Sequence, residues 1–466
     1  MAAPTLRLTF LGAAGQVTGS MHMLEAAGMK LVLDAGLFQG RRKEADALNR
    51  NLPFDPRVLD AVVLSHAHID HTGRVPLLVN HGFHGPIYAT PATRDLCAVM
   101  LADSAHIQES DFEHLKRHDR AGPESEPLYT MRDAVAAQEL MVGVPYKRIQ
   151  HLRKNLTIEY VDAGHILGSA SIDVRITEGK QPHRLVFSGD IGRTGMPIIR
   201  NPDPPTGPID TLIIESTYAL KTHAAPADAE NDLAAIIAKV VGRGGKILIP
   251  SFAVGRTQEM VYAIHELLRA KKIPQVPVYI DSPLATETTT VFRMHPEIFD
   301  KTEDMVKAES PLFDHHLVTY TRSVEDSKRL NTLNGPAIII SASGMVEAGR
   351  ILHHIKNHGG DHRNCILFVG FQAEHTLGRR IKDGDRKVKI HGDEVELRAD
   401  IEVIDGYSAH AGRNELIAWI KALGGPIKRA FAVHGEPESL AEMASLLKQA
   451  GVSEVHVPAQ GQSFDL

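Results

Sequence analysis

The sequence contains very little cysteine, and this excludes two ways of stabilising a fold or holding a metal. Cys97 and Cys365 are its only cysteines among 466 residues. Neither a disulfide framework nor a cysteine zinc site is therefore available. Any metal ion would have to be bound by histidine, aspartate and glutamate, and the chain has 26 histidines and 57 acidic residues.

Long apolar runs and a targeting segment are also missing. No apolar stretch approaches the roughly 20 residues that a membrane-spanning helix needs. The first residues, MAAPTLRLTF, lack the basic region and the following apolar region of a secretory signal. We therefore expect a soluble, cytoplasmic protein with no membrane partner.

An excess of basic charge is absent as well. The formal net charge of −6 argues against a protein that coats nucleic acid without specificity, but it does not exclude a locally basic groove. The length of 466 residues exceeds what one hydrophobic core usually supports. We therefore expect two domains, or one domain with a large insert.

Strand and helix patterns change twice along the chain. The first part is rich in strand patterns, with one long helical stretch expected at residues 92–118. After the proline-rich segment 201–208, strands alternate with helical stretches such as 228–241 and 255–270, which predicts a mostly parallel sheet. A strand-rich pattern resumes near Val395. The simplest interpretation is an α/β domain inserted into a discontinuous first domain, with segments 1–208, 209–394 and 395–466.

The run LSHAHIDHTG, at residues 64–73, carries the strongest functional signal. It directly follows an apolar stretch that predicts a buried strand, and we expect its polar residues to share one tight loop. A single His-x-His is common by chance, but packing gives no reason for four residues of metal-ligand type within six positions. Zinc and similar divalent ions favour this mixture of nitrogen and oxygen donors. The four residues of the predicted metal site are His66, His68, Asp70 and His71.

Further polar residues stand where apolar strands are expected to end. Taken singly, an aspartate or histidine at such a position often caps a turn. The repeated order of apolar strand, polar residue and small residue instead indicates a site at one rim of a sheet. These residues are Asp34, His165, Asp190, Glu215, His410 and His434.

The order of these residues resembles a known family. The HxHxDH run, a later histidine and a later aspartate are similar to the metallo-β-lactamase-fold signature, and IIESTY, GYSAHA and VHGE resemble the three additional motifs of its β-CASP subgroup. SFAVGRTQE, YIDSPLA, SASGM and QAEHTLGRRI resemble bacterial β-CASP ribonucleases, relatives of the nuclease subunit of the cleavage and polyadenylation specificity factor. The resemblance implies an α/β fold, a metallo-β-lactamase αββα sandwich with an inserted Rossmann-like parallel α/β β-CASP domain.

The resemblance also implies a two-zinc centre, in which Mn²⁺ or Fe²⁺ could replace zinc. His66, His68 and His165 would hold one ion. Asp70, His71 and His434 would hold the other, with Asp190 bridging the two. Asp34 would orient a ligand histidine or the bridging water through a hydrogen bond, and a histidine at position 434 indicates the RNA-directed branch of the family.

For the chemical step, we expect in-line attack by an activated water at phosphorus, giving 5′-phosphate and 3′-hydroxyl ends. His410 is the candidate general acid for the leaving 3′ oxygen, and Glu215 would raise its pKa and fix its tautomer. The predicted catalytic residues are His410, Glu215, Asp70 and Asp34.

RNA contacts are expected in the inserted domain. Residues 341–345 follow an apolar strand and precede a helical run that begins near Val346, an arrangement that presents backbone N–H groups and a helix N-terminus to an anion. A structural turn is an equally good interpretation of these residues, and the arginines nearby could be solvated surface charges. His375 departs from the small residue usual in relatives, a change that would alter substrate choice if it faces RNA. The predicted RNA-binding residues are Ser341, Ser343, Gly344, Arg256, Arg350 and Arg379.

These features predict a zinc-dependent ribonuclease of single-stranded RNA, acting in RNA processing or decay and forming a homodimer as relatives usually do. Endonuclease and 5′-exonuclease modes share one metal centre, so both stay open. A hydrolase of small esters or thioesters is the second interpretation, and the long insert argues against it. A non-catalytic RNA-binding subunit is the third, and the complete set of expected ligands argues against that.

Overall fold

The computed structural model describes residues 6–40, 42–118, 122, 125–178, 181–299, 313, 316–370 and 372–466. The chain forms two compact units. The first unit consists of Met1–Thr194, Arg200–Thr222 and His410–Leu466, and the second consists of Gly195–Ile199 and His223–Ala409. None of the helices that the structure describes combines the length and the apolar character needed to cross a membrane.

The first unit contains two seven-stranded sheets. One sheet has the order β22-β1-β2-β3-β4-β5-β6, and the other has the order β21-β20-β11-β10-β9-β8-β7. The strands of the first sheet are β1 (Arg7–Gly12), β2 (Met21–Ala26), β3 (Met29–Leu33), β4 (Ala61–Val63), β5 (Ile87–Ala89), β6 (Met141–Gly143) and β22 (Ser463–Asp465). Those of the second are β7 (Gln150–Arg153), β8 (Leu156–Asp162), β9 (Ala170–Ile176), β10 (His183–Phe187), β11 (Ile209–Glu215), β20 (Ile427–Val433) and β21 (Glu454–His456).

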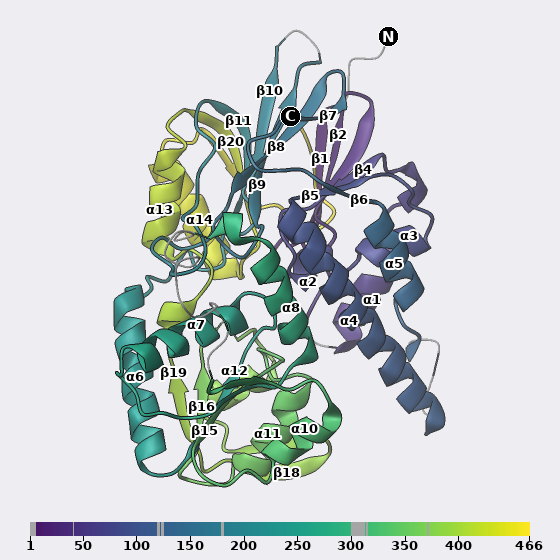
Figure 1. Cartoon of the computed structure of the whole chain (residues 1–466). Coiled ribbons are helices and arrows are strands. Elements are labelled where there is room, and N and C mark those ends of the chain that lie inside the picture. The colour runs from purple at the N-terminus through teal and green to yellow at the C-terminus, as the bar shows by residue number, and fades with distance from the viewer. Residues whose placement is uncertain are drawn as a thin grey trace. The chain divides into compact units, whose positions relative to one another are not determined.

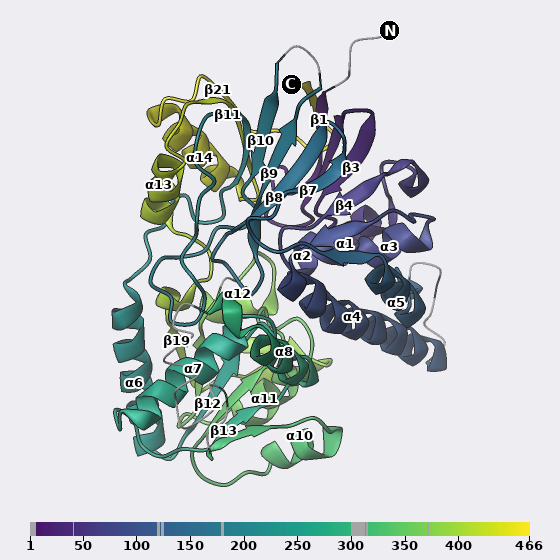
Figure 2. The ribbon, with the colours of Figure 1, turned by 45° about the horizontal axis from the view of Figure 1, so that its top comes forward.

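Helices complete the first unit. The long helical stretch expected at residues 92–118 is confirmed as α4 (Pro91–Arg117), which begins with proline at its first position and with the Thr90 side chain accepting a hydrogen bond from the Thr93 N–H. Figure 2 shows α4 and α5 running side by side. The other helices are α1 (Arg42–Arg50), η1 (Pro56–Val58), α2 (Ile69–Thr72), α3 (Val75–Asn80), α5 (Met131–Glu139), α13 (Arg413–Ala422) and α14 (Pro437–Gln449).

The core of the first unit lies between its sheets. Phe10 of β1 and Leu33 of β3 belong to one buried cluster with Ile172 of β9 and Phe431 of β20, so the inner faces of both sheets pack together. A second cluster joins the opposite face of β11 and β20 to α13 and α14, which lie on that flank of the sheet in Figure 1. The sheets therefore form the sandwich expected from the sequence, and the α/β fold class is confirmed.

The second unit is built on a six-stranded sheet of order β14-β13-β15-β12-β16-β19, in which every neighbouring pair is parallel. Its strands are β12 (Lys246–Pro250), β13 (Val278–Ile280), β14 (Val318–Tyr320), β15 (Ala337–Ser341), β16 (Cys365–Phe368) and β19 (Asp400–Val403), beside a hairpin of β17 (Lys387–Ile390) and β18 (Asp393–Glu396). The helices are α6 (Pro226–Gly242), α7 (Arg256–Arg269), α8 (Pro283–Met294), η3 (Pro296–Ile298), α10 (Val324–Leu330), α11 (Arg350–His358), α12 (Leu377–Lys382) and η4 (Asp405–Tyr407). The parallel sheet and the helices expected at 228–241 and 255–270 are confirmed.

Two strands lie in a different sheet from the one the sequence suggested. Strand β11 falls in the segment 209–394 that was assigned to the insert, yet it pairs with β10 and β20 of the first unit. Strand β19 falls in the segment 395–466 that was assigned to the first domain, yet it pairs with β16 of the second unit. Both are parallel strands, and the local pattern of such a strand does not depend on which sheet receives it.

Candidate metal centre

The HxHxDH run leaves β4 and passes directly into the short helix α2. His66 and His68 precede the helix, and Asp70 and His71 belong to it, so the single tight loop expected from the sequence is a loop followed by a helical turn. The segment after β3 supports this turn, because the Ala35 N–H donates to the His71 carbonyl at 2.7 Å and the Leu37 N–H donates to the Ile69 carbonyl at 2.9 Å. The bond to His71 uses a carbonyl group that the end of the helix leaves unpaired, whereas the Ile69 carbonyl also accepts from the Gly73 N–H at 2.8 Å.

Close approach of the backbone at this point requires a glycine. A Cβ atom added to Gly36 would lie 1.5 Å from the Asp70 carbonyl oxygen. The Ser20 N–H also donates to that oxygen at 2.8 Å, and the Gly36 N–H donates to the Ser20 carbonyl at 2.9 Å. The backbone of the two segments therefore holds Asp70 and His71 in place.

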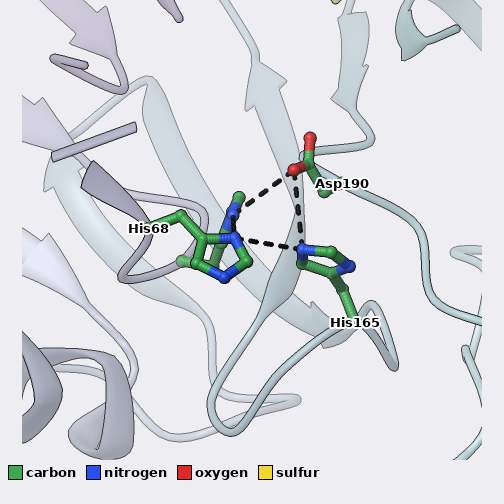
Figure 3. Close-up of side chains that lie close together, drawn as sticks. His68, His165 and Asp190 are labelled. Atoms are coloured by element: carbon green, nitrogen blue, oxygen red, sulfur yellow. Dashed lines mark hydrogen bonds and ion pairs between the residues drawn. The ribbon is translucent and has the colours of Figure 1, made fainter. Parts of the chain in front are cut away.

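Four side chains converge to form a first donor group, which consists of His66, His68, His165 and Asp190. The His68 Nδ1 atom lies 3.0 Å from His66 Nε2 and 3.2 Å from His165 Nε2. Asp190 Oδ2 lies 3.4 Å from His66 Nε2 and 3.6 Å from His165 Nε2. Figure 3 shows His68, His165 and Asp190 directed toward one another. Three imidazole nitrogens and a carboxylate oxygen thus surround one point.

A second donor group consists of Asp70, His71 and His434. The Nε2 atoms of His71 and His434 lie 3.1 Å apart, and Asp70 Oδ2 lies 3.6 Å from His434 Nε2. Asp190 Oδ2 also lies 3.4 Å from His71 Nε2. The carboxylate of Asp190 is therefore shared by both groups, and the structure brings together all seven residues that the sequence predicted as metal ligands.

The charges of these groups fit a bound cation. Burial lowers the pKa of His66 well below its usual range and that of His68 to about 4, so both rings are neutral and present lone pairs. Burial alone would raise the pKa of Asp190, but His434, His71 and His66 hold it well below its usual range. Its buried Oδ1 atom has no hydrogen-bond donor among the described residues. An ionised carboxylate and neutral imidazoles at this spacing form a donor set that fits a divalent metal ion.

His71 differs from His66 and His68 in its charge. Burial alone would lower its pKa, but the carboxylates of Asp190 and Asp34 raise it well above the usual range. His71 Nδ1 lies 2.6 Å from Asp34 Oδ2, and Asp34 is itself fully buried. Asp34 also accepts hydrogen bonds from the Ser65 N–H, at 2.7 Å, and from the Ser20 hydroxyl, at 3.1 Å. A cation bound at Nε2 would take the place of the proton there, while Asp34 holds the ring.

His410 and Glu215 form a pair beside the first donor group. His410 Nδ1 lies 3.3 Å from Glu215 Oε1 and 3.8 Å from Asp190 Oδ2. Burial would lower the pKa of His410, but Glu215 and Asp190 raise it above its usual value. Glu215 is 1% exposed, and its two oxygens accept the N–H groups of Ile191 and Thr217. The carboxylate is therefore fixed, and it orients the imidazole.

The residues predicted to bind RNA lie in the second unit, and three of them are held by internal bonds. The buried hydroxyl of Ser341 donates to the Asp281 carbonyl at 2.9 Å. Arg350 donates to Asp281 Oδ1 at 2.7 Å and to the Arg322 carbonyl at 2.8 Å. Arg256 is buried and paired with Glu259. These three side chains therefore support the protein interior.

The remaining predicted RNA contacts are less enclosed. Ser343 and Gly344 lie on the loop after β15, and the partly exposed Arg379 is paired with Asp383 at 2.8 Å. The helix after this loop begins at Arg350 and not near Val346, and the residue before it, Gly349, has a non-helical φ of 78°. The expectation of a helix N-terminus directly after residues 341–345 was therefore wrong. His375 is exposed and has a φ of 67°.

Sequence reasoning missed the hydroxyl groups that touch the ligand histidines. Ser65 Oγ lies 3.1 Å from His66 Nδ1 and donates to Asp34 Oδ2 at 2.9 Å. Thr217 Oγ1 lies 3.1 Å from His434 Nδ1. Both residues stand one or two positions from a predicted site residue, which is the only signal that the sequence offers for them.

Comparison with known proteins agrees with this geometry. The chain matches the metallo-beta-lactamase superfamily over residues 14–222, the Beta-Casp domain over 257–381 and the Zn-dependent metallo-hydrolase RNA specificity domain over 394–458. A crystal structure of a protein of unknown function from Enterococcus faecalis covers 99% of this chain and 100% of its own, with a TM-score of 0.53 and 14% identity, and shows a similar fold.

Relatives are found among bacteria and archaea. Ribonuclease TTHA0252 of Thermus thermophilus is 36% identical over 96% of this chain and 97% of its own. Transcription termination factor FttA of Methanosarcina mazei is 30% identical over 94% of this chain and 68% of its own length. FttA of Pyrococcus horikoshii is 30% identical over 96% of this chain and 69% of its own length. This chain therefore belongs to the β-CASP ribonuclease family of the metallo-β-lactamase superfamily.

Proposed function

We propose that this protein is a zinc-dependent ribonuclease that hydrolyses phosphodiester bonds of single-stranded RNA and leaves 5′-phosphate and 3′-hydroxyl ends. The observation that carries the proposal is the convergence of two donor groups on the shared carboxylate of Asp190, with the His410–Glu215 pair beside them. The 36% identity to a protein named as a ribonuclease supports RNA as the substrate.

Two zinc ions fit the two donor groups, the first held by His66, His68 and His165 and the second by Asp70, His71 and His434. Manganese or iron would be accepted by the same nitrogen and oxygen atoms. When bound, such ions would supply Lewis acidity toward a phosphate oxygen and an activated water at neutral pH. Asp34 holds the His71 ring through Nδ1, which leaves Nε2 directed at the second group.

His410 is the proposed proton donor to the leaving 3′ oxygen. Glu215 occupies its Nδ1 side at 3.3 Å, so the other ring nitrogen is left to face the substrate. Because the Ile191 and Thr217 N–H groups hold both Glu215 oxygens, the pair keeps its orientation through the reaction. We place Ser343, Gly344 and Arg379 along the RNA, whereas Ser341, Arg256 and Arg350 would act by holding the segments around them. A cytoplasmic homodimer that acts in RNA processing or decay, by endonuclease or 5′-exonuclease cleavage, is part of the same proposal.

A second candidate function is cleavage of nascent RNA during transcription termination. Two archaeal relatives at 30% identity carry the name of a termination factor. Release of RNA from a stalled elongation complex by the purified protein would favour this role. Cleavage of free RNA without any such release would leave the role in processing or decay.

The test of the proposal is cleavage of a single-stranded RNA labelled at its 5′ end, with DNA of matched sequence as the control substrate. We expect the zinc-loaded protein to cut the RNA, His410→Ala to bind zinc but cut poorly, and His84→Ala to behave as the wild type, because His84 is an exposed histidine outside the centre. Fragment lengths report endonuclease or exonuclease mode. Failure of the zinc-loaded wild type to cut RNA would contradict the proposal and favour a small ester as substrate.

A further inference from the structure

A histidine binds a metal through one ring nitrogen, and the group that faces its other nitrogen decides which one is free. For His71 that group is the Asp34 carboxylate, 2.6 Å from Nδ1. The Asp34 oxygens accept hydrogen bonds from the Ser65 N–H and from the Ser20 and Ser65 hydroxyls, and they accept from His71 Nδ1 in the same way. Nδ1 therefore keeps its proton, and Nε2 is the atom that can serve as a ligand when a cation takes the place of the proton there.

For His434 the nearest group is a hydroxyl, and the Asp190 carboxylate lies farther away, with its Oδ1 atom 3.7 Å from His434 Nδ1. Thr217 Oγ1 lies 3.1 Å from His434 Nδ1, and a hydroxyl can either donate to this nitrogen or accept from it. The same oxygen lies 3.3 Å from the His434 carbonyl oxygen, which can only accept. A hydroxyl has a single proton, so when that proton points to the carbonyl the oxygen offers a lone pair to Nδ1–H. Nε2 then carries no proton, and it faces His71 Nε2 at 3.1 Å.

The backbone holds both partners in this arrangement. Thr217 is 7% exposed, and its own N–H donates to Glu215 Oε2 at 3.2 Å. The His434 N–H donates to the Ala13 carbonyl at 2.8 Å, and the Ser216 N–H donates to the His434 carbonyl at 3.1 Å. His434 has a φ of 53°, a left-handed conformation that histidine adopts only where its surroundings hold it.

We propose that Thr217 is a positioning residue that keeps the proton of His434 on Nδ1, so that Nε2 is available to the second donor group. The inference rests on the metal centre of the proposed function and adds a residue to it. Thr217 holds the Glu215 carboxylate through its backbone N–H and the His434 ring through its side chain. One residue therefore links the proton donor pair to the second donor group.

The test compares zinc binding by metal-free wild type, Thr217→Val and Thr217→Ser, in competition with a chromogenic chelator. Valine keeps the shape of threonine and removes the hydroxyl, and serine keeps the hydroxyl. We expect the valine variant to lose about 10- to 100-fold in affinity for one of two zinc ions and to keep the other, the size of effect usual when a partner of a ligand is removed. The serine variant should bind both ions as the wild type does.

Ser439→Ala is the matched control. The Ser439 hydroxyl is buried beside Thr217 and lies 3.4 Å from its carbonyl oxygen, so its removal disturbs the same segment without touching His434. We expect its zinc binding to equal that of the wild type. Wild-type affinity in Thr217→Val, or an equal loss for both ions, would overturn the inference.

A second measurement needs no variant to fold. In the zinc-loaded wild type labelled with ¹⁵N-histidine, we expect His434 to show a protonated Nδ1, and a protonated Nε2 would overturn the inference. RNA cleavage by the wild type is scored separately. A protein that binds zinc as described but leaves RNA intact would fail the proposed function and leave the role of Thr217 standing.

Discussion

The two units of the molecule each contain a buried polar cluster, and the two clusters are built on opposite principles. In the second unit, the fully buried Asp281 carboxylate is surrounded by donors that the chain itself supplies. Hydroxyls of Thr321 and Ser327, the Arg350 guanidinium and His354 Nε2 all lie within 2.7 Å of its oxygens. Nothing has to be added from outside to balance its charge.

The centre of the first unit is arranged in the other way. There the ring nitrogens of His66, His68 and His165 and the Asp190 carboxylate converge, and the buried Asp190 Oδ1 has no hydrogen-bond donor among the described residues. Acceptors that face one another favour a cation between them. Hydrogen-bond balance, rather than burial or polarity, therefore distinguishes a cluster that binds an ion from one that holds the fold together.

Removing the Asp190 carboxylate, which both donor groups share, should have the largest effect on the metal centre. We expect Asp190→Asn to weaken zinc binding and to reduce RNA cleavage by at least about 100-fold. Losing a hydrogen-bond partner of a metal ligand usually costs about 10- to 100-fold, and losing a carboxylate that both donor groups share should cost more. Zinc content and initial cleavage rates measure this. Asp173→Asn is the control, since Asp173 is a buried aspartate of the same unit that pairs with Arg175 and Arg184. Full activity in Asp190→Asn would contradict the assignment.

Breaking the balanced cluster should affect stability and leave zinc alone. Asp281→Asn removes the charge that compensates the partly buried Arg350, and we expect a loss of about 3 kcal/mol in the free energy of unfolding. Urea unfolding followed by circular dichroism measures the loss. Zinc content of the folded variant should equal that of the wild type. A fall in zinc content without a fall in stability would show that the cluster around Asp281 is not structural.

The balanced cluster also predicts a dependence of stability on pH. Burial would raise the pKa of Asp281, but hydrogen bonds from His354, Ser327, Thr321 and Arg350 lower it below the usual 3.8. A carboxyl with a lowered folded-state pKa stabilises the protein above its unfolded pKa and loses this contribution as pH falls through the folded value. The charged and titratable groups that face it are Arg350, His354 and, at longer range, His353.

The gap in unfolding free energy between wild type and Asp281→Asn should therefore stay constant above about pH 5 and narrow below about pH 4. Urea unfolding of both proteins across this range measures the gap. A difference in unfolding free energy that grows as the pH falls would contradict a lowered pKa of Asp281 in the folded protein.

The smallest expected effect concerns His375, which lies outside both clusters. The φ of 67° strains the backbone of a residue with a side chain more than that of glycine, so glycine would stabilise the folded state. Glycine also has more conformational entropy in the unfolded chain, which offsets part of this gain. We expect His375→Gly to raise the free energy of unfolding by less than about 1 kcal/mol. Thermal unfolding measures the change, and a set of RNAs of different sequence would show whether the imidazole also affects substrate choice. A clear loss of stability would mean that the His375 side chain makes a stabilising contact.

The sequence was sufficient for features that depend on neighbouring residues. Helix α4 could be predicted because a helical pattern runs over residues 92–118. The site residues between His66 and His71 could be predicted because they directly follow a buried strand. Strands β11 and β19 were placed in the wrong sheet, because their partners come from distant parts of the chain.

The hydroxyls of the centre were missed for a different reason. Serine and threonine are common, and only the distances around Ser65 and Thr217 show which acceptor lies near the proton of each hydroxyl. In the same way, the loop before Arg350 could not be recognised until the structure showed the non-helical conformation of Gly349. Local pattern thus predicts which residues carry chemistry, and long-range contacts decide which residues support them.

The central claim is that the convergent donors of the first unit bind metal and use it to cut RNA. The most direct test is to count zinc by mass spectrometry in the loaded, gel-filtered protein and to follow cleavage of labelled single-stranded RNA in the same sample, before and after chelation. The account predicts two zinc ions per chain, RNA products with 5′-phosphate ends, and loss of cleavage when the zinc is removed. Undiminished cleavage by the metal-free protein, or bound zinc without any cleavage of RNA, would contradict it.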